Sequence, residues 1–381
     1  MFHSAVSLTA PIEKSTLDGF ASHPNGIRDA SMGRVNNFDA VRLLAAAAVI
    51  FGHAHPLTNT PSPALLGNSV QALAVKIFFV ISGYLIFTSW TLEPVLTRYM
   101  RKRSLRIFPA LIAIILFSAF VVGPALTALP LAEYAANGRM LHYLKNIFLY
   151  PVYDLPGVFA DNAYPVAVNG SLWSLPVEFA MYLTLPLVCV IGARLRLKWL
   201  LGGFALALCA ASIYYVRLAP PAAHPVFYGS DLISALDVAP YFMIGAFIAQ
   251  AKLEKYLEPS LALFLIGVVA LVPPSSAWAG EIVLYAVLPI SVLSLSLAAH
   301  PVLSKAGRYG DFSYGLYLYG FLVQQIVNHL AGNKLSALEN ALVSLPIALA
   351  CAALSWHYIE KPMLALKNKK PVAALVPRTS E

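Results

Sequence analysis

The sequence predicts an all-α fold, a polytopic membrane bundle of about ten transmembrane helices with both termini cytoplasmic. Composition excludes a soluble globular protein, because 59% of the 381 residues are hydrophobic and only 12% are charged. The mean hydropathy is +0.70, and soluble domains carry about 25% charged residues. Long apolar runs and the placement of the basic residues point to the same fold class.

The apolar runs define the expected helices. A bilayer is crossed by about 17 to 25 residues, and a chain in hydrocarbon must be helical because no water satisfies its backbone amides. The seventh of ten runs is short for this purpose. The runs are 39–57, 70–92, 105–129, 172–191, 199–217, 232–251, 260–273, 279–297, 313–332 and 338–360.

The basic residues set the orientation, because Lys and Arg gather in short cytoplasmic loops. With the N-terminus inside, 21 of the 26 Lys and Arg residues fall on the cytoplasmic side. The formal charge of +8 is therefore mainly a topology signal, and we expect no nucleic-acid partner. The exceptions are Lys76 inside a run and Arg139, Lys145, Arg217 and Lys334 on the outer side.

Three parts follow along the chain. Residues 1–38 are expected to form a flexible cytoplasmic leader, 39–362 the transmembrane domain and 363–381 a basic cytoplasmic tail. The longest connection, about 130–171, lies on the outer side, and a loop of this length usually covers a cavity or meets a substrate. We expect no bound metal and no permanently bound cofactor.

Two polar residues in the first run suggest a site. His53 follows Arg42 by eleven residues, which on a helix places it on nearly the same face and about 16 Å deeper. An ionisable group at that depth is a candidate functional residue. The alternative is an ordinary inside-facing charge above a hydrogen-bonded packing histidine.

The second run contains Phe78 and Phe79 followed by Ser82 and Gly83. Small residues let helices approach closely and leave room for a slender ligand, and close packing alone explains them equally well. Lys76 just before them is either a side chain reaching toward the interface or the partner of a carboxylate.

Basic residues then follow on the cytoplasmic side. Arg103 and Arg106 are helical neighbours, and guanidinium groups bind phosphates through paired hydrogen bonds. Together with Arg42 they could hold a polyanion at the inner mouth of a cavity. The alternative is a topology signal whose arginines contact lipid phosphates.

The fourth run carries Glu178 near its outer end, at a depth similar to that of His53. A carboxylate beside an imidazole raises its basicity, as a general base acting on a hydroxyl requires. Glu178 paired with another polar group is the alternative. Asp237 and Glu281 are weaker candidates that we interpret as structural.

Six motifs in this order resemble the acyltransferase 3 family of membrane O-acyltransferases, over about residues 36–365. They are Arg42-x10-His53, Phe78-Phe79-Val80-Ile81-Ser82-Gly83, Arg103-x-x-Arg106 before Phe108-Pro109, Trp173-Ser174-Leu175 with Glu178, Ser313-Tyr314-Gly315-Leu316-Tyr317-Leu318-Tyr319, and Tyr358-Ile359-Glu360-Lys361-Pro362. Two positions depart from many relatives: Lys76 replaces an acidic residue and Gly320 replaces a histidine.

The resemblance implies a stand-alone enzyme, without a fused hydrolase-like domain, in the plasma membrane (the inner membrane of a bacterium). It would move an acyl group, usually acetyl, from cytoplasmic acyl-CoA to a hydroxyl of a surface glycan or lipid-linked sugar. His53 would be the catalytic imidazole, with Glu178 orienting it or the acceptor. Arg42, Arg103 and Arg106 would hold the donor phosphates.

On this hypothesis the donor arm passes the Phe78–Gly83 element and the small residues 45–48 to reach His53. The rival hypothesis is a transporter or flippase for a sugar-lipid or an anion, in which the same polar residues line a permeation path. Internal repeats are common in transporters, and we find no convincing repeat here. The acceptor, the acyl chain length and the oligomeric state stay undetermined.

Overall fold

The computed structural model describes residues 36–271 and 276–368. Within them, eight helical segments are long and apolar enough to cross a membrane, which confirms the polytopic helical fold. The remaining two predicted helices are also present. One is short, with 13 residues, and the other contains several buried polar residues. Most of the expected leader, 1–38, and of the expected tail, 363–381, lies outside the described residues.

The helices of the bundle follow the predicted runs, except that α3 begins at Leu96, well before the predicted start at 105. They are α1 (Phe38–Leu57), α2 (Val70–Leu92), α3 (Leu96–Phe117), α7 (Ser174–Arg194), α8 (Leu200–Ser212), α9 (Leu232–Gln250), α10 (Pro259–Leu271), α11 (Ala277–Leu297), α12 (Ser313–Leu330) and α13 (Ala337–Ser355). Shorter α-helices are α4 (Gly123–Leu126), α5 (Leu131–Ala136), α6 (Gly138–Tyr143) and α14 (Lys361–Ala365).

Short π-helical turns continue three of the long helices, at Ser118–Val122 after α3, Ile213–Leu218 after α8 and Trp356–Glu360 after α13. Turns of 3-10 helix cover Leu144–Phe148, Gly170–Trp173, Leu253–Tyr256, Leu303–Tyr309 and Leu366–Asn368. Two small antiparallel hairpins, which the sequence did not predict, pair β1 (Ala64–Leu65) with β2 (Asn68–Ser69) and β3 (Val226–Phe227) with β4 (Ser230–Asp231).

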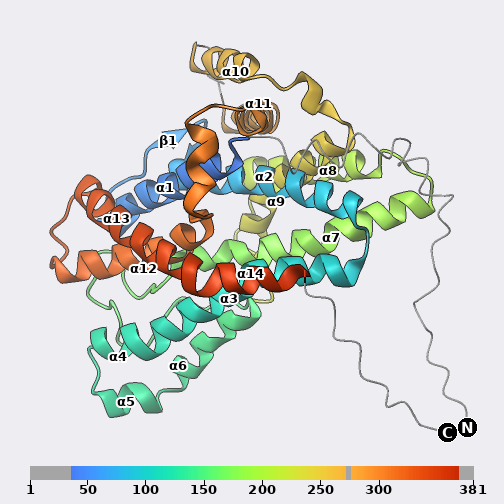
Figure 1. The fold of residues 1–381 in the computed structure, drawn as a ribbon. Coiled ribbons are helices and arrows are strands. Elements are labelled where there is room, and N and C mark those ends of the chain that lie inside the picture. Colours follow the sequence, from blue (N-terminus) through green and yellow to red (C-terminus); the bar gives the residue numbers. More distant parts are fainter. Residues whose placement is uncertain (1–35, 272–275, 369–381) are drawn as a thin grey trace, which may run out of the picture.

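The bundle has two distinct ends. We call the end where α1 begins and α2 ends the basic end, and the opposite end, which carries the segment from 127 to 173, the loop end. At the loop end, α5 and α6 lie at the lower left of Figure 1, next to α4, which continues the helix begun by α3. The predicted long loop therefore contains helical structure of its own.

α2 and α9 cross closely because each has a glycine at the crossing. A Cβ atom at Gly83 would collide with the backbone carbonyl of Phe242, and one at Gly245 with that of Val80. Close helix packing of this kind depends on small residues. It accounts for Gly83, one of the two interpretations left open by the sequence.

The polar residues of α12 hold the centre of the bundle together. Gln324 donates from Nε2 to the Ile50 carbonyl of α1, over 2.8 Å, and to Oδ1 of Asn340 in α13. Asn328 donates to the Leu57 carbonyl, and Gln325 to backbone carbonyls of the loop end. These bonds explain why a helix of modest hydropathy is buried.

A buried cluster of two cations and two carboxylates decides between the two interpretations of Lys76. Its Nζ lies 2.8 Å from Oε1 of Glu281 and 3.1 Å from Oδ1 of Asp237, and the side chain is fully buried. Arg217 supplies the second cation, 2.6 Å from Oε2 of Glu281, and Tyr241 donates to Glu281. Lys76 is thus a partner of carboxylates, and Asp237 and Glu281 form ion pairs within this cluster.

Candidate active site

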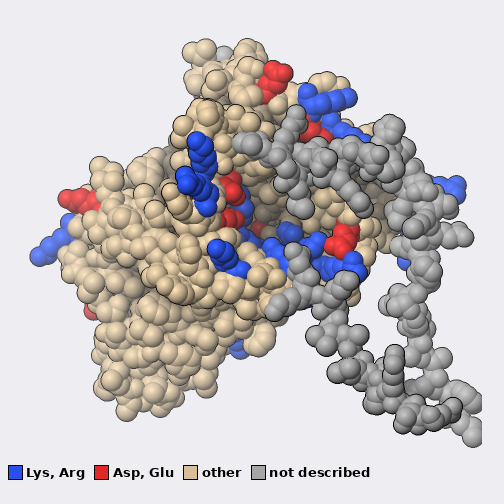
Figure 2. Space-filling view, viewed as in Figure 1, with Lys and Arg blue, Asp and Glu red and all other residues tan. Residues whose placement is uncertain are grey.

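A cavity of about 330 Å³ opens at the basic end between α1, α2, α3, α7 and α12, and we call it the basic cavity. Blue Lys and Arg side chains gather near the centre of the face seen in Figure 2, with a broad tan surface to the left and below. Gly83 and His53 are not among its lining residues. The other predicted site residues do line it: Arg42, Phe78, Phe79, Ser82, Arg103, Arg106 and Glu178.

Asp311 connects two of the arginines at the mouth of this cavity. Its Oδ2 lies 2.8 Å from Nη1 of Arg42 and 2.6 Å from Nη2 of Arg106. Burial alone would raise the pKa of Asp311, but Arg106, Arg42 and hydrogen bonds from Ser313 outweigh it and hold the pKa well below its ordinary value. Arg106 also lies 3.5 Å from Glu360, so its charge is already balanced.

Arg103 differs from Arg106 in its partners. Its guanidinium lies about 6 Å from the rings of Tyr99 and Tyr182. Its buried Nε has no hydrogen-bond partner, and no ion pair joins Arg103 to a carboxylate of the described chain. Lys367 lines the same cavity. Burial, followed by the charges of Arg103, Arg106 and Lys102, lowers its pKa to about 8. The cavity therefore has unneutralised positive charge.

Glu178 lies deeper in the basic cavity. Its Oε1 accepts hydrogen bonds from Ser82 Oγ, over 2.8 Å, and from Tyr182 Oη, over 2.6 Å. No contact between Glu178 and His53 occurs within the described chain, so the expected carboxylate–imidazole pair is not formed in this structure. The alternative interpretation, a carboxylate bound by other polar groups, accounts for the observed partners.

His53 lies in α1 beyond the inner end of the basic cavity. Its imidazole packs edge-on against the Phe321 ring, with centroids 5.3 Å apart. Its Nδ1 is buried and has no hydrogen-bond partner among residues 36–271 and 276–368. Ala45 and Ala46, expected along the donor path, are instead buried in helix packing. The imidazole of His53 is half-buried, and its Nδ1 is free to accept or donate a hydrogen bond.

Tyr317 and Ser174 contact each other in the wall of the basic cavity. The Tyr317 hydroxyl lies 2.6 Å from Ser174 Oγ and donates to the Ser171 carbonyl over 2.9 Å. The Phe78 ring packs edge-on against Tyr317. Tyr317 and Ser174 both line the basic cavity, and Phe321 is one helical turn beyond Tyr317 on α12. Sequence reasoning placed Tyr317 in a motif but gave it no role.

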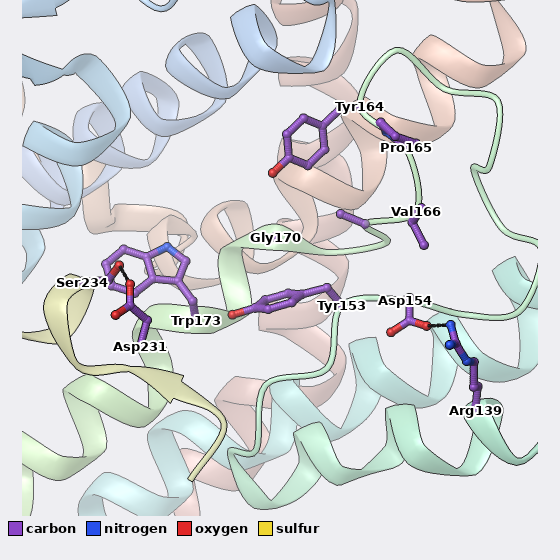
Figure 3. Close-up of a pocket in the computed structure, with 11 residues that line it drawn as sticks. Arg139, Tyr153, Asp154, Tyr164, Pro165, Val166, Gly170, Trp173, Asp231 and Ser234 are labelled. Atoms are coloured by element: carbon purple, nitrogen blue, oxygen red, sulfur yellow. Dashed lines mark hydrogen bonds and ion pairs between the residues drawn. The ribbon is translucent and has the colours of Figure 1, made fainter. Parts of the chain in front are cut away.

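A second cavity, of about 800 Å³, opens at the loop end, and we call it the loop cavity. Trp173 lines it, whereas the next residue, Ser174, lines the basic cavity. Tyr153 and Tyr164 supply further aromatic wall (Figure 3). The two cavities thus approach each other from opposite ends at the start of α7, close to the helix that carries Phe321.

The acyltransferase domain model of the acyltransferase 3 family matches residues 35–357. The chain belongs to this family. It is 29% identical to an O-acetyl transferase of Shigella phage Sf6, over 89% of this chain and 99% of that protein. It is 30% identical to nodulation protein 10 of Rhizobium leguminosarum bv. viciae, over 89% and 95% of the two chains.

This acyltransferase is also 24% identical to the peptidoglycan O-acetyltransferase OatA of Listeria monocytogenes, over 86% of this chain and 56% of that protein. No solved structure matches the chain. The family confirms that the protein is an integral-membrane O-acyltransferase. The two arginines joined by Asp311 and the imidazole beyond Tyr317 are therefore features of an acyl-transfer enzyme.

Proposed function

We propose that this enzyme takes an acyl group from acyl-CoA in the basic cavity, and that this group is acetyl. It passes the group to a hydroxyl of a glycan or glycosylated acceptor that enters from the loop end. The observation that carries the proposal is the unneutralised positive charge of Arg103 and Lys367 in the lining of the basic cavity. A nucleotide with several phosphates complements that charge.

The donor would lie along the basic cavity. Its phosphates would contact Arg103 and Lys367, while Asp311 holds Arg42 and Arg106 in place beside them. The flexible arm would run between Phe78 and Ser82 of α2 and the start of α7. For the thioester to reach His53, the Tyr317 and Ser174 side chains would have to part.

The transfer itself needs a base and a path for one proton. The acceptor oxygen attacks the thioester carbonyl while His53 takes the hydroxyl proton. The C–S bond then breaks, and the departing thiolate recovers that proton from the imidazolium, which leaves an ester and free CoA. The unpartnered Nδ1 of His53 supports this role, and general-base catalysis is typically worth about 10²- to 10⁴-fold in rate.

The test is release of CoA from acetyl-CoA by the purified protein in lipid nanodiscs. We expect His53→Ala to lower the rate by about 10²- to 10⁴-fold with unchanged membrane insertion. His55→Gln, on the same helix, is the matched control and should keep normal activity. An active His53→Ala enzyme would remove His53 from the mechanism. Acetyl-CoA left intact by the wild type would instead contradict acetyl-CoA as the donor.

The orientation belongs to the same proposal. We assign the basic end to the cytoplasmic side of the plasma membrane, and with it both termini, because its loops carry most of the Lys and Arg residues. This orientation presents the basic cavity to cytoplasmic acyl-CoA and the loop cavity to acceptors outside.

A further inference from the structure

The loop cavity has the size of a small-molecule site and an aromatic wall. Its volume of about 800 Å³ falls within the range of about 300 to 1,000 Å³ typical of ligand sites. Tyr153, Tyr164 and Trp173 all belong to the segment from 127 to 173 and turn toward the same space (Figure 3). Together they provide flat apolar surfaces that face the cavity rather than the protein core.

Two of these aromatic residues also present free polar groups to the cavity. Neither the Tyr153 hydroxyl nor the Trp173 indole N–H makes a hydrogen bond to any described residue, and neither atom is buried. Tyr and Trp side chains suit a ligand that is apolar on one side and polar on the other. A sugar ring has this character, because C–H bonds cover its faces and hydroxyls its edge.

The rim of the cavity supplies hydrogen-bond acceptors. Asp154 forms an ion pair with Arg139 over 2.9 Å. Asp231 accepts hydrogen bonds from Ser234, His224 and the Ile233 amide. Burial raises the pKa of Asp231, but these hydrogen bonds outweigh burial and hold the pKa below its ordinary value. The carboxylate therefore stays ionised. The cavity is lined by two carboxylates, Asp154 and Asp231, and by one arginine, Arg139. The excess negative charge would repel an anionic ligand, so a neutral ligand is favoured.

A single aromatic ring lies between this cavity and His53. Tyr164 packs against Phe321 with centroids 6.2 Å apart, and Phe321 packs against the imidazole. Gly170, which lines the cavity, also touches Phe321, since a Cβ atom there would lie 2.7 Å from its ring. A ligand in the cavity would therefore be next to the ring that covers the proposed base.

We propose that the loop cavity is the acceptor subsite and that it binds an uncharged sugar ring. One face of the ring stacks on Trp173 or Tyr153, and its hydroxyls donate to Asp154 and Asp231. The inference rests on the proposed function, since it names where and in what form the acceptor is held. It further predicts that sugars with a carboxylate or phosphate on this ring are poor acceptors.

The experiment uses the full-length protein in nanodiscs with acetyl-CoA and a panel of soluble acceptors. The probes are methyl glycosides of glucose, galactose, rhamnose and N-acetylglucosamine, with methyl glucuronide as the charged counterpart. Product formation gives the KM for each acceptor, and saturation-transfer NMR gives binding without turnover. The variants are Trp173→Leu, Trp173→Phe and Tyr153→Leu. The matched control is Phe227→Leu, an exposed aromatic of the bordering hairpin that does not line the cavity.

We expect Trp173→Leu and Tyr153→Leu each to raise the KM or the dissociation constant of neutral glycosides about tenfold. The KM for acetyl-CoA should change less than twofold, which also shows that the variants are folded. Trp173→Phe keeps a ring and should retain most of the affinity. Phe227→Leu should behave as the wild type, and methyl glucuronide should bind poorly to all forms.

Unchanged glycoside affinity in both leucine variants of an active enzyme would overturn the subsite and leave the proposed function intact. Absence of any glycoside binding to the wild type would overturn it as well. If the wild type binds glycosides at this site but never consumes acetyl-CoA, the proposed donor fails instead. Preferred binding of the glucuronide would contradict the uncharged character of the ring.

Discussion

Lys367 gives the basic cavity a charge that changes near neutral pH. Its pKa, lowered to about 8 by burial and by neighbouring basic side chains, means that it loses its proton as the pH rises from 7 to 9. We expect the affinity for CoA to fall by about fivefold over this range, because one partly exposed ion pair contributes about 1 kcal/mol to binding. Titration calorimetry at several pH values measures this, and proton uptake should accompany binding below pH 9.

Two variants at this position make the prediction specific. Lys367→Arg stays charged and should keep the affinity constant from pH 7 to 9, while Lys367→Met should show the weak affinity throughout. Unfolding at high pH would not explain such a fall in CoA affinity. Because the folded pKa lies below the ordinary value of 10.5, deprotonation between pH 8 and 10.5 stabilises the folded protein. A pH dependence that persists in Lys367→Met would contradict the assignment.

For single residues, the sequence predicted which side chains belong to the site better than it predicted which residues they contact. Hydrophobic runs and spacing placed Arg42, Arg103 and Arg106 at the mouth of one cavity, because each lies at a predictable depth on a predictable helix, whereas Glu178 was expected beside His53 and lines the basic cavity instead. Asp311 was missed because it precedes a motif in a connection, and only tertiary folding brings it to the arginines. Its position as an acidic residue between a basic loop and an apolar run was the available signal.

At the scale of elements, the crossing of α2 and α9 predicts a strong effect of one methyl group. Gly83→Ala would push a Cβ atom into the Phe242 carbonyl, and a backbone atom cannot move aside as a side chain can. We expect destabilisation of about 1 to 3 kcal/mol or more, seen as a lower Tm of the detergent-solubilised protein. Gly203→Ala in α8 is the control, since no atom lies within 4 Å of its added methyl. Equal Tm values for both variants would contradict the tight crossing.

The helices themselves were predictable because a bilayer allows few alternatives. Hydropathy alone is a poorer guide to burial, as α12 illustrates. Gln324 and Asn328 lower its hydropathy, yet both are fully buried because they bind backbone carbonyls of α1. Such partners are distant in the sequence, so periodicity could not reveal them. The structure within 130–171 was missed for a related reason, since its short helices lack a long apolar run.

At the scale of the whole molecule, the proposed function assigns a different substrate to each of the two cavities. The basic cavity and the loop cavity open at opposite ends and approach each other where Trp173 meets Ser174. An enzyme built in this way can use a donor from one side of the membrane and an acceptor from the other. Phe321 and the Tyr317–Ser174 contact would keep the two compartments separate between turnovers.

This arrangement requires the basic end to face the cytoplasm, where acyl-CoA is found. Two exposed lysines flank α12 at its opposite ends, Lys305 and Lys334. In a background without the three native cysteines, we expect Lys334→Cys to react with a membrane-impermeant maleimide in intact cells. Lys305→Cys should react only after the membrane is permeabilised. The reverse pattern would place the basic cavity outside the cell, away from acyl-CoA, and the proposed donor would have to be abandoned.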